Sequence, residues 1–282
     1  MFLYTQQHPK LSDNFLYHYT NSNALFEILK SMRLRVGTFK NLNDLNEADI
    51  CSTFSNVGKN SPGDVERFIK EHCGQIGFAQ NYVVDHICHP GCNHPRMWAQ
   101  YADNNKGACI VINESSFLKK NEEVLKNTLF WDICNVDYKS KIENWDIKND
   151  IYKFVELNYS QLFFNKHRDW EHEDERRIFM INGPEYLSIL DCIEFIALGK
   201  NFEKTDYLTL VDVISCKDNS CYKQLMPHDF AKAENSLGNI SLQDNSFEII
   251  EIVKSKNESI SEYIDFLISK GLSPENFKTL LY

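Results

Sequence analysis

Residues 165–180 read NKHRDWEHEDERRIFM, and this stretch decides how the rest of the chain is interpreted. Its last residues form an apolar run that predicts a buried strand. Because side chains of an extended strand alternate between its two faces, Glu171, Glu173, Glu175 and Arg177 are expected to share one face. The carboxylates of Glu173 and Glu175 would then lie roughly 7 Å apart.

Two interpretations of this acidic pair are open. Like charges at that distance raise each other's pKa unless a cation or ligand intervenes, so the pair suits a site that binds a hydroxyl or a developing cation. Alternatively, the stretch is a solvated acidic turn whose charge is balanced by Arg168, Arg176 and Arg177. The local pattern does not choose between them.

Composition narrows the class of protein. The chain has 282 residues, a hydrophobic fraction of 43% and a net charge of −10, which argues against a protein that coats DNA or a membrane through positive charge. No apolar run approaches the ~20 residues of a membrane span, and the opening residues lack a signal-peptide pattern. We therefore expect a cytoplasmic protein without a membrane partner, whose nine cysteines are reduced.

Hydrophobic periodicity predicts an α+β fold. Strands are expected at residues 15–20, 34–38, 75–79, 108–112, 131–138, 177–181, 192–198, 208–214 and 247–253. Helices are expected directly after residue 20 and at residues 61–73, 95–102, 147–166, 260–270 and 274–281. We expect one domain over residues 1–225 and a C-terminal extension over residues 226–282 that packs on it, with a linker at residues 227–245.

The first strand ends in a polar corner formed by His18, Tyr19 and Thr20. A helix start follows, with Thr20 or Asn21 as its cap, and backbone N–H groups at such a start can hold a ligand. A satisfied structural histidine is the alternative for His18.

A second group of polar candidates is Asn43, Asp44 and Glu47. These residues suit a site, but equally suit turns and caps.

Trp98, Tyr101 and Ala102 share one face of the expected helix at residues 95–102. Ordinary core packing and contact with a ligand both remain open for the two aromatic side chains.

Residues 86–94 read HICHPGCNH and concentrate ligands that zinc prefers. A zinc site would use Cys88, His89, Cys92 and His94, with His86, Cys51 or Cys73 available to complete it. A structural zinc site usually draws on two separated ligand pairs, so a loop with incidental Cys and His residues is the alternative, and no metal is the main prediction.

The order of these pieces resembles a bacterial family known only as a domain of unknown function. The resemblance spans roughly residues 15–200 and rests on three motifs, which are HYT at residues 18–20, MW-x-x-YA at residues 97–102 and W-x-x-E-x-E-x-R at residues 170–177. That family is in turn similar, more distantly, to the ADP-ribosyltransferase superfamily. The resemblance implies a core of mixed or antiparallel strands with flanking helices, and NAD as co-substrate.

Residue roles follow from this resemblance. It implies that His18 orients NAD, that Tyr101 packs on the nicotinamide, that Glu175 is the catalytic glutamate and that Glu173 positions the acceptor. Further NAD-binding residues are expected to be Tyr19, Thr20, Trp98, Lys166 and Arg177, the last two as partners of a phosphate. The chain departs from the family at residues 78–80, which are largely apolar here, and at Leu45, where a proline is usual.

The resemblance also implies a class of partner. The acceptor of ADP-ribose would be a protein, RNA or DNA, and the chain would be a bacterial toxin or phage-defence effector with an antitoxin or immunity partner.

Two other classes stay open. One is a metal-dependent nuclease or hydrolase that uses Asp44, Glu47, Glu173 and Glu175 around magnesium. The other is a non-catalytic module that binds a nucleotide or a partner.

Overall fold

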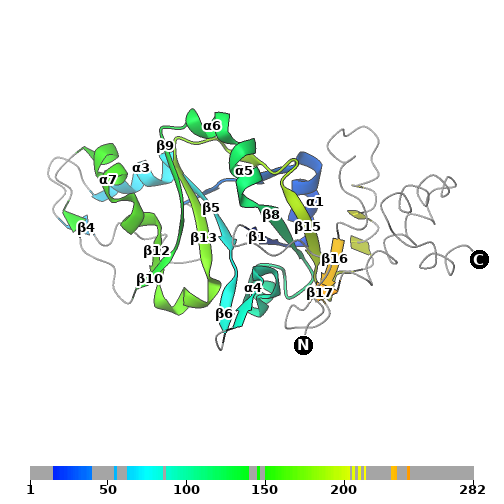
Figure 1. The fold of residues 1–282 in the computed structure, drawn as a ribbon. Helices are drawn as coiled ribbons and strands as arrows, with labels where there is room; N and C mark the ends of the chain where they lie inside the picture. Colours follow the sequence, from blue (N-terminus) through cyan, green and yellow to red (C-terminus); the bar gives the residue numbers. More distant parts are fainter. Residues whose placement is uncertain are drawn as a thin grey trace, which may run out of the picture.

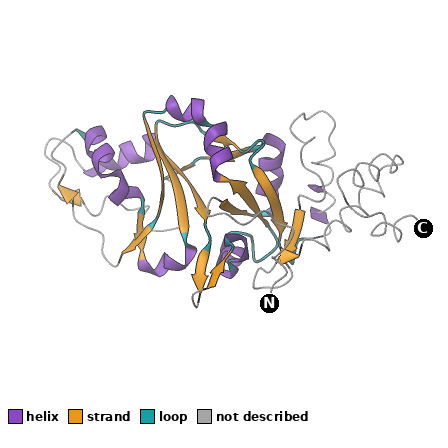
Figure 2. Ribbon diagram, in the orientation of Figure 1, coloured by secondary structure: helices purple, strands orange, loops and turns teal. Residues whose placement is uncertain are grey.

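The computed structural model describes residues 15–39, 54–55, 62–84, 87–139, 145–146, 150–203, 205–206, 209–210, 213, 230–233 and 240–241. Within these residues the protein is α+β, with a nine-stranded sheet and helices on both of its faces (Figures 1 and 2). The expected fold class is therefore confirmed at the level of an α+β domain, and an ADP-ribosyltransferase core stays a prediction.

The main sheet has the order β17-β16-β15-β8-β1-β5-β13-β9, with β3 paired to β5. Its strands are β1 (Phe15–Thr20), β3 (Gly37–Thr38), β5 (Cys73–Ala79), β8 (Ala108–Asn113), β9 (Phe130–Asn135), β13 (Glu175–Ile181), β15 (Ile193–Leu198), β16 (Phe230–Ala233) and β17 (Ile240–Ser241). Neighbouring strands are antiparallel except β15 and β16, which are parallel.

Short strand pairs and helices surround this sheet. The paired strands are β10 (Asp137–Lys139) with β12 (Asn165–His167), β11 (Trp145–Asp146) with β4 (Phe54–Ser55), β14 (Tyr186–Ser188) with β2 (Arg33–Arg35), and β6 (Tyr82–Val84) with β7 (Ile87–His89). The α-helices with described bounds are α1 (Ser22–Ser31), α3 (Pro62–His72), α4 (Pro95–Gln100), α5 (Glu114–Lys120), α6 (Glu122–Lys126) and α7 (Ile151–Phe163). Two 3-10 helices are η2 (Gly91–Asn93) and η3 (Arg168–Glu173).

Helix α1 forms where capping and periodicity agree. The side chain of Asn21 accepts a hydrogen bond of 2.8 Å from the backbone N–H of Ala24, which satisfies a donor at the helix start. Leu25 and Leu29, one turn apart, are fully buried against the sheet. The predicted cap and apolar face of this helix are confirmed.

Three hydrophobic clusters divide the core. The first, on one face of the sheet, includes Leu16 and Phe78 and is covered by α1, α5 and α6. The opposite face carries two aromatic clusters. We call them the α7 cluster, in which Phe163 stacks on Phe179 at 4.1 Å, and the α4 cluster, in which Tyr19 meets Trp98 edge-on at 5.2 Å.

Some predicted elements differ from the structure. Residues 34–38 form parts of two short strands rather than one, and residues 131–138 belong to β9 and β10. The helix expected at residues 147–166 ends at Phe163, so Lys166 lies on β12 instead. The strand expected at residues 208–214 is wrong where residues are described, because residues 209–210 and 213 are helical.

The domain boundary at residue 225 stays a prediction. Within the predicted linker at residues 227–245 and the C-terminal extension, only residues 230–233 and 240–241 are described, and they add β16 and β17 to the main sheet. The elements expected at residues 247–253, 260–270 and 274–281 lie outside the described residues. In the part of the chain that is described, no helix combines the length and hydrophobicity that a membrane crossing requires.

Candidate active site

The acidic motif folds as a tight turn rather than as one continuous strand. Residues up to Glu173 belong to η3, Asp174 has a left-handed backbone with φ of 44°, and β13 starts at Glu175. The expectation that Glu171 shares a strand face with Glu175 is therefore wrong. The left-handed residue reverses the chain locally, which turns both Glu173 and Glu175 toward Lys166.

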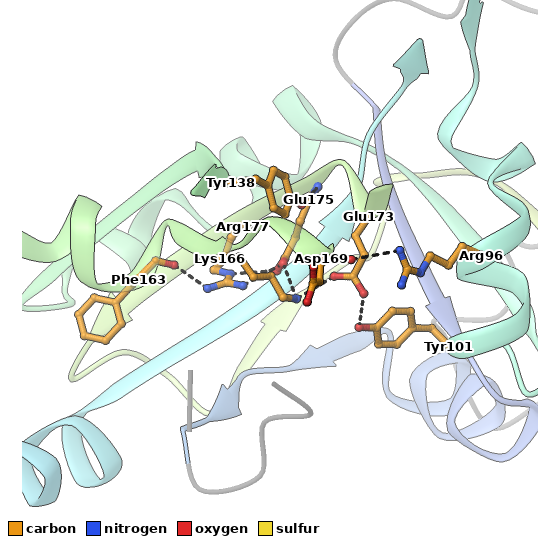
Figure 3. A network of polar contacts seen from close by, with 9 residues as sticks. All are labelled: Arg96, Tyr101, Tyr138, Phe163, Lys166, Asp169, Glu173, Glu175 and Arg177. Atoms are coloured by element: carbon orange, nitrogen blue, oxygen red, sulfur yellow. Dashed lines mark hydrogen bonds and ion pairs between the residues drawn. The ribbon is translucent and has the colours of Figure 1, made fainter. Parts of the chain in front are cut away.

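These side chains form a closed polar network (Figure 3). Lys166 Nζ donates to Glu173 Oε2 at 2.7 Å and to Glu175 Oε2 at 3.3 Å. Arg177 binds Glu175 through two N–H groups, at 2.9 and 2.8 Å, and Tyr101 donates its hydroxyl to Glu173 Oε1 at 2.7 Å. All four residues of the W-x-x-E-x-E-x-R motif take part, since the Lys166 ammonium lies 4.8 Å from the ring centroid of Trp170.

We call this set the carboxylate network and define it by Tyr101, Tyr138, Lys166, Trp170, Glu173, Glu175 and Arg177. The hydroxyl of Tyr138 accepts a hydrogen bond of 3.0 Å from the backbone N–H of Glu175. A further N–H of Arg177 donates to the carbonyl oxygen of Phe163 at 2.5 Å, which ties the network to the α7 cluster.

Burial distinguishes the network from a solvated turn. The exposed fraction of the side chain is 6% for Lys166, 2% for Glu173, 12% for Glu175 and 1% for Arg177. Two carboxylates and two cations thus balance one another within the protein, as buried charges require. The solvated alternative describes only the outer residues, such as the exposed pair of Arg168 and Glu171.

The network holds Glu175 in its charged form. Burial raises the pKa of the Glu175 carboxyl, but the positive charges of Arg177 and Lys166 together outweigh burial and bring the pKa below its ordinary value. Burial also raises the pKa of the Tyr138 hydroxyl, so this group stays protonated at neutral pH. A carboxylate kept ionised among protein groups can stabilise positive charge that develops on a substrate.

A break in strand pairing opens beside Glu175. On the edge of β5 that faces β1 and β3, Ala79 pairs with Tyr17, and Gln75 pairs with Gly37. Between these pairs lies Gly77, which is exposed although its strand has neighbours on both sides. We call this position the Gly77 gap.

The Glu175 carboxylate lies directly against the Gly77 gap. A Cβ atom added to Gly77 would stand 2.5 Å from Glu175 Oε1. Glu175 is also the most exposed of the four charged side chains of the network, at 12%. The most exposed charged side chain of the network thus lies against an exposed glycine.

His18 lies across the sheet from the carboxylate network. Tyr17 and Glu175 both pair with Ala79, so the next residue, His18, points to the opposite face, where its ring meets Phe78 edge-on at 5.9 Å. Desolvation by the surrounding protein lowers the pKa of His18 to about 4, although a hydrogen bond with the backbone of Gly77 opposes this shift. His18 is therefore a neutral imidazole on the face opposite the network, and it does not join the network.

Three further residues proposed to bind NAD, Trp98, Tyr19 and Thr20, are buried in the core. Trp98 is fully buried and donates its indole N–H to the carbonyl oxygen of Cys92 at 2.8 Å, and Tyr19 donates its hydroxyl to the carbonyl oxygen of Gly91 at 2.6 Å. Thr20 is buried at the end of β1. For Trp98 and Tyr19 the structure shows core packing, while Tyr101 of the same helical face enters the network.

The predicted zinc ligands occupy different environments. Cys88 is exposed on β7, Cys92 is buried in the α4 cluster, and the ring of His89 stacks on Tyr82 at 5.3 Å. His94 is buried, with Nε2 at 3.7 Å from a carboxylate oxygen of Asp174. Among the described residues, which include neither Cys51 nor His86, no group of three or more His, Cys, Asp or Glu side chains is placed to hold a metal ion.

Asn43, Asp44 and Glu47 lie outside the described residues, so their proposed roles stay predictions. Sequence reasoning missed Tyr138 and Gly77. The only signal for Gly77 was a glycine inside an apolar strand, which often marks the close approach of another group. Nothing in the sequence pointed to Tyr138, because its contact with Glu175 spans 37 residues.

The Gly77→Ala substitution tests the close contact at the gap. Glu175 cannot move aside freely, because Arg177 and Lys166 hold its carboxylate. We expect the free energy of unfolding, measured with urea, to fall by about 1–3 kcal/mol. Gly37→Ala is the matched control, since an added Cβ there meets only the Gln75 carbonyl oxygen, at 3.3 Å. Equal stability of the two variants would show that Glu175 does not pack on Gly77.

Residues 97–178 match the family described as "Protein of unknown function (DUF2971)". The DUF2971 match covers less than half of the chain, yet it includes every member of the carboxylate network and ends one residue after Arg177. Gly77 and His18 lie before it. Neither the curated proteins nor the solved structures contain a match to this chain.

Proposed function

We propose that the protein is an NAD-dependent ADP-ribosyltransferase whose catalytic centre is the carboxylate network at the Gly77 gap. One observation carries the proposal. The carboxylate of Glu175, which is largely buried between Arg177 and Lys166, lies against Gly77, an exposed glycine inside the sheet.

The chemistry of NAD gives such a carboxylate a role. When the bond between the ribose C1′ and the nicotinamide nitrogen breaks, positive charge develops on the ribose, as in glycoside hydrolysis. A fixed carboxylate stabilises this charge more in the transition state than in the ground state. Arg177 and Lys166 act indirectly, because they keep Glu175 ionised and fixed before substrate binds.

The second carboxylate completes the transfer. The acceptor atom forms a bond to C1′, the bonding electron pair leaves with nicotinamide, and the proton of the acceptor passes to Glu173. Tyr101 and Lys166 hold the two oxygens of Glu173 at 2.7 Å each and so fix its orientation. Lys166 and Arg177 both bind the Glu175 carboxylate, which favours this orienting role over the phosphate contact that the resemblance implies.

The partners belong to the same proposal. The acceptor is a protein, RNA or DNA, and the resemblance favours a toxin or defence effector with a cognate antitoxin or immunity protein. The nuclease alternative gains nothing from the described residues, since Asp44 and Glu47 lie outside them and no group of three or more His, Cys, Asp or Glu side chains within them is placed to hold a metal ion.

Incubation of the full chain with NAD labelled in the adenylate part tests the function. Protein, RNA and DNA acceptors are supplied separately, and released nicotinamide is measured beside labelled acceptor. We expect label on one acceptor class, with one nicotinamide released per ADP-ribose transferred. Binding of NAD without nicotinamide release would instead indicate a binding module, and neither binding nor release would contradict the proposal.

A further inference from the structure

Three described residues, Gln75, His94 and Asn105, have a buried side-chain atom for which the described part of the chain shows no hydrogen-bond partner. Of these, Gln75 lies on the main sheet; its exposed fraction is 7%, and the unpartnered atom is its side-chain oxygen Oε1. A buried polar atom of this kind costs free energy, and nearly all such atoms in folded proteins are paired. Because none of the described residues supplies a donor, a hydrogen bond from a ligand would satisfy this oxygen.

The position of Gln75 places this acceptor at the proposed catalytic centre. Gln75 stands two residues before Gly77 on β5 and pairs with Phe179 of β13. Because strand side chains alternate, Gln75 points to the same face as Phe179 and Arg177, the face that carries the Glu175 carboxylate. It also borders the Gly77 gap, since its other backbone partner is Gly37 of β3.

We propose that Gln75 Oε1 accepts a hydrogen bond from the carboxamide N–H of nicotinamide, an inference that rests on the proposed function. A neutral, buried acceptor suits a neutral N–H donor and is unsuited to the phosphates of NAD, which are acceptors. Among the hydrogen-bond donors of NAD, the carboxamide belongs to the nicotinamide ring, which leaves C1′ in the reaction. This ring is attached to the ribose whose positive charge Glu175 is proposed to stabilise. Gln75 thus acts as a specificity residue for the nicotinamide end.

The inference predicts opposite effects on stability and on recognition. Gln75→Met keeps the length of the side chain and removes the unpaired oxygen, so we expect Tm without ligand to equal or exceed that of the wild type. The same change removes the acceptor, so NAD should bind roughly fivefold to tenfold more weakly. If Gln75 had a purely structural role, its replacement would not weaken NAD binding while Tm without ligand stayed equal or rose.

An NAD analogue isolates the hydrogen bond. The 3-acetylpyridine analogue of NAD replaces the carboxamide by an acetyl group and has no N–H to donate. We expect the wild type to prefer NAD over the analogue in KM, and Gln75→Met to lose that preference. The control is Gln161→Met, which makes the same exchange at an exposed position of α7 and should keep the preference.

The outcomes distinguish failure of the Gln75 assignment from failure of the proposed ADP-ribosyltransferase function. If the wild type consumes NAD and prefers it, but Gln75→Met retains that preference, the assignment of Gln75 is overturned and the proposed function stands. A wild type without any preference overturns the assignment as well, and a wild type that neither binds nor consumes NAD overturns both. Should Gln75→Met melt below the wild type, Gln75→Asn, which keeps the amide but shortens its reach, is expected to lose the preference too.

Discussion

Replacing Glu175 by glutamine is expected to lower the rate of ADP-ribose transfer by about 100-fold to 1,000-fold. Glutamine has nearly the same shape, so it can still occupy the space beside Gly77, but it is neutral. The charge that opposes the developing positive charge on the ribose is lost, which should appear in kcat rather than in KM. Single-turnover release of nicotinamide from labelled NAD measures this directly.

Glu114→Gln is the matched control for this substitution. Glu114 binds Arg176 through two N–H groups, at 2.8 and 2.6 Å, just as Glu175 binds the next residue, Arg177. Glu114 and Arg176 are, however, on the α5 side of the sheet, away from the network. The control should transfer at the rate of the wild type. A Glu175→Gln variant that remains folded and equally active would remove Glu175 from the mechanism.

Arg177→Met is expected to lower the free energy of unfolding by about 3–5 kcal/mol at neutral pH. Arg177 is 1% exposed and is the foremost positive charge that lowers the pKa of Glu175. Removing it leaves a carboxylate largely buried beside Lys166 alone, and it leaves the Phe163 carbonyl without this donor. Urea unfolding monitored by circular dichroism measures the loss.

The matched control is Arg176→Met, one residue earlier on the same strand. Its side chain is 23% exposed, against 1% for Arg177, so its charge is better hydrated and the expected loss is smaller, about 1–2 kcal/mol. Equal losses at the two positions would contradict a special role for the buried pair.

The pH dependence of the Arg177→Met deficit follows from the sign of the pKa shift. In the wild type, the pKa of Glu175 is lower in the folded state than in the unfolded state. The Glu175 carboxylate therefore contributes its full stabilisation above the unfolded pKa of about 4.3, and this contribution is lost as pH falls through the folded pKa. The variant lacks one of the two positive charges that oppose burial, so the folded pKa of Glu175 lies higher than in the wild type and protonation costs the variant less stability. The difference in stability between the two proteins should therefore shrink as pH falls.

Much of the local structure could be predicted from the sequence. The apolar runs ending in Thr20 and Ile181, the Asn21 cap and the helix over Pro62–His72 are local features, so propensity and periodicity suffice for them. The helix before Lys166 was predicted too long, because the stop at Phe163 depends on β12 pairing with β10, a contact made by residues distant in the sequence.

The candidate site was predicted in part. The motif at residues 170–177 supplied Glu173, Glu175 and Arg177, and the helix after His94 supplied Tyr101. Lys166, which binds both glutamates, was instead assigned to a phosphate. Spacing alone also suggested that Glu171 joins them, which the left-handed Asp174 prevents. The face of His18 could not be predicted either, since it depends on which residue of β5 pairs with Tyr17.

By itself, the sequence determined which residues are apolar, where strands and helices start, and that two glutamates and two basic residues stand close together along the chain. Tertiary structure alone decided that these charges are buried and paired, and that His18 and Glu175 lie on opposite faces of the sheet. It also decided that Gln75 Oε1 has no hydrogen-bond partner among the described residues. The physical reason is that burial, register and pairing are set by strands far apart in sequence, and a one-residue change in their register would exchange every side chain between the two faces.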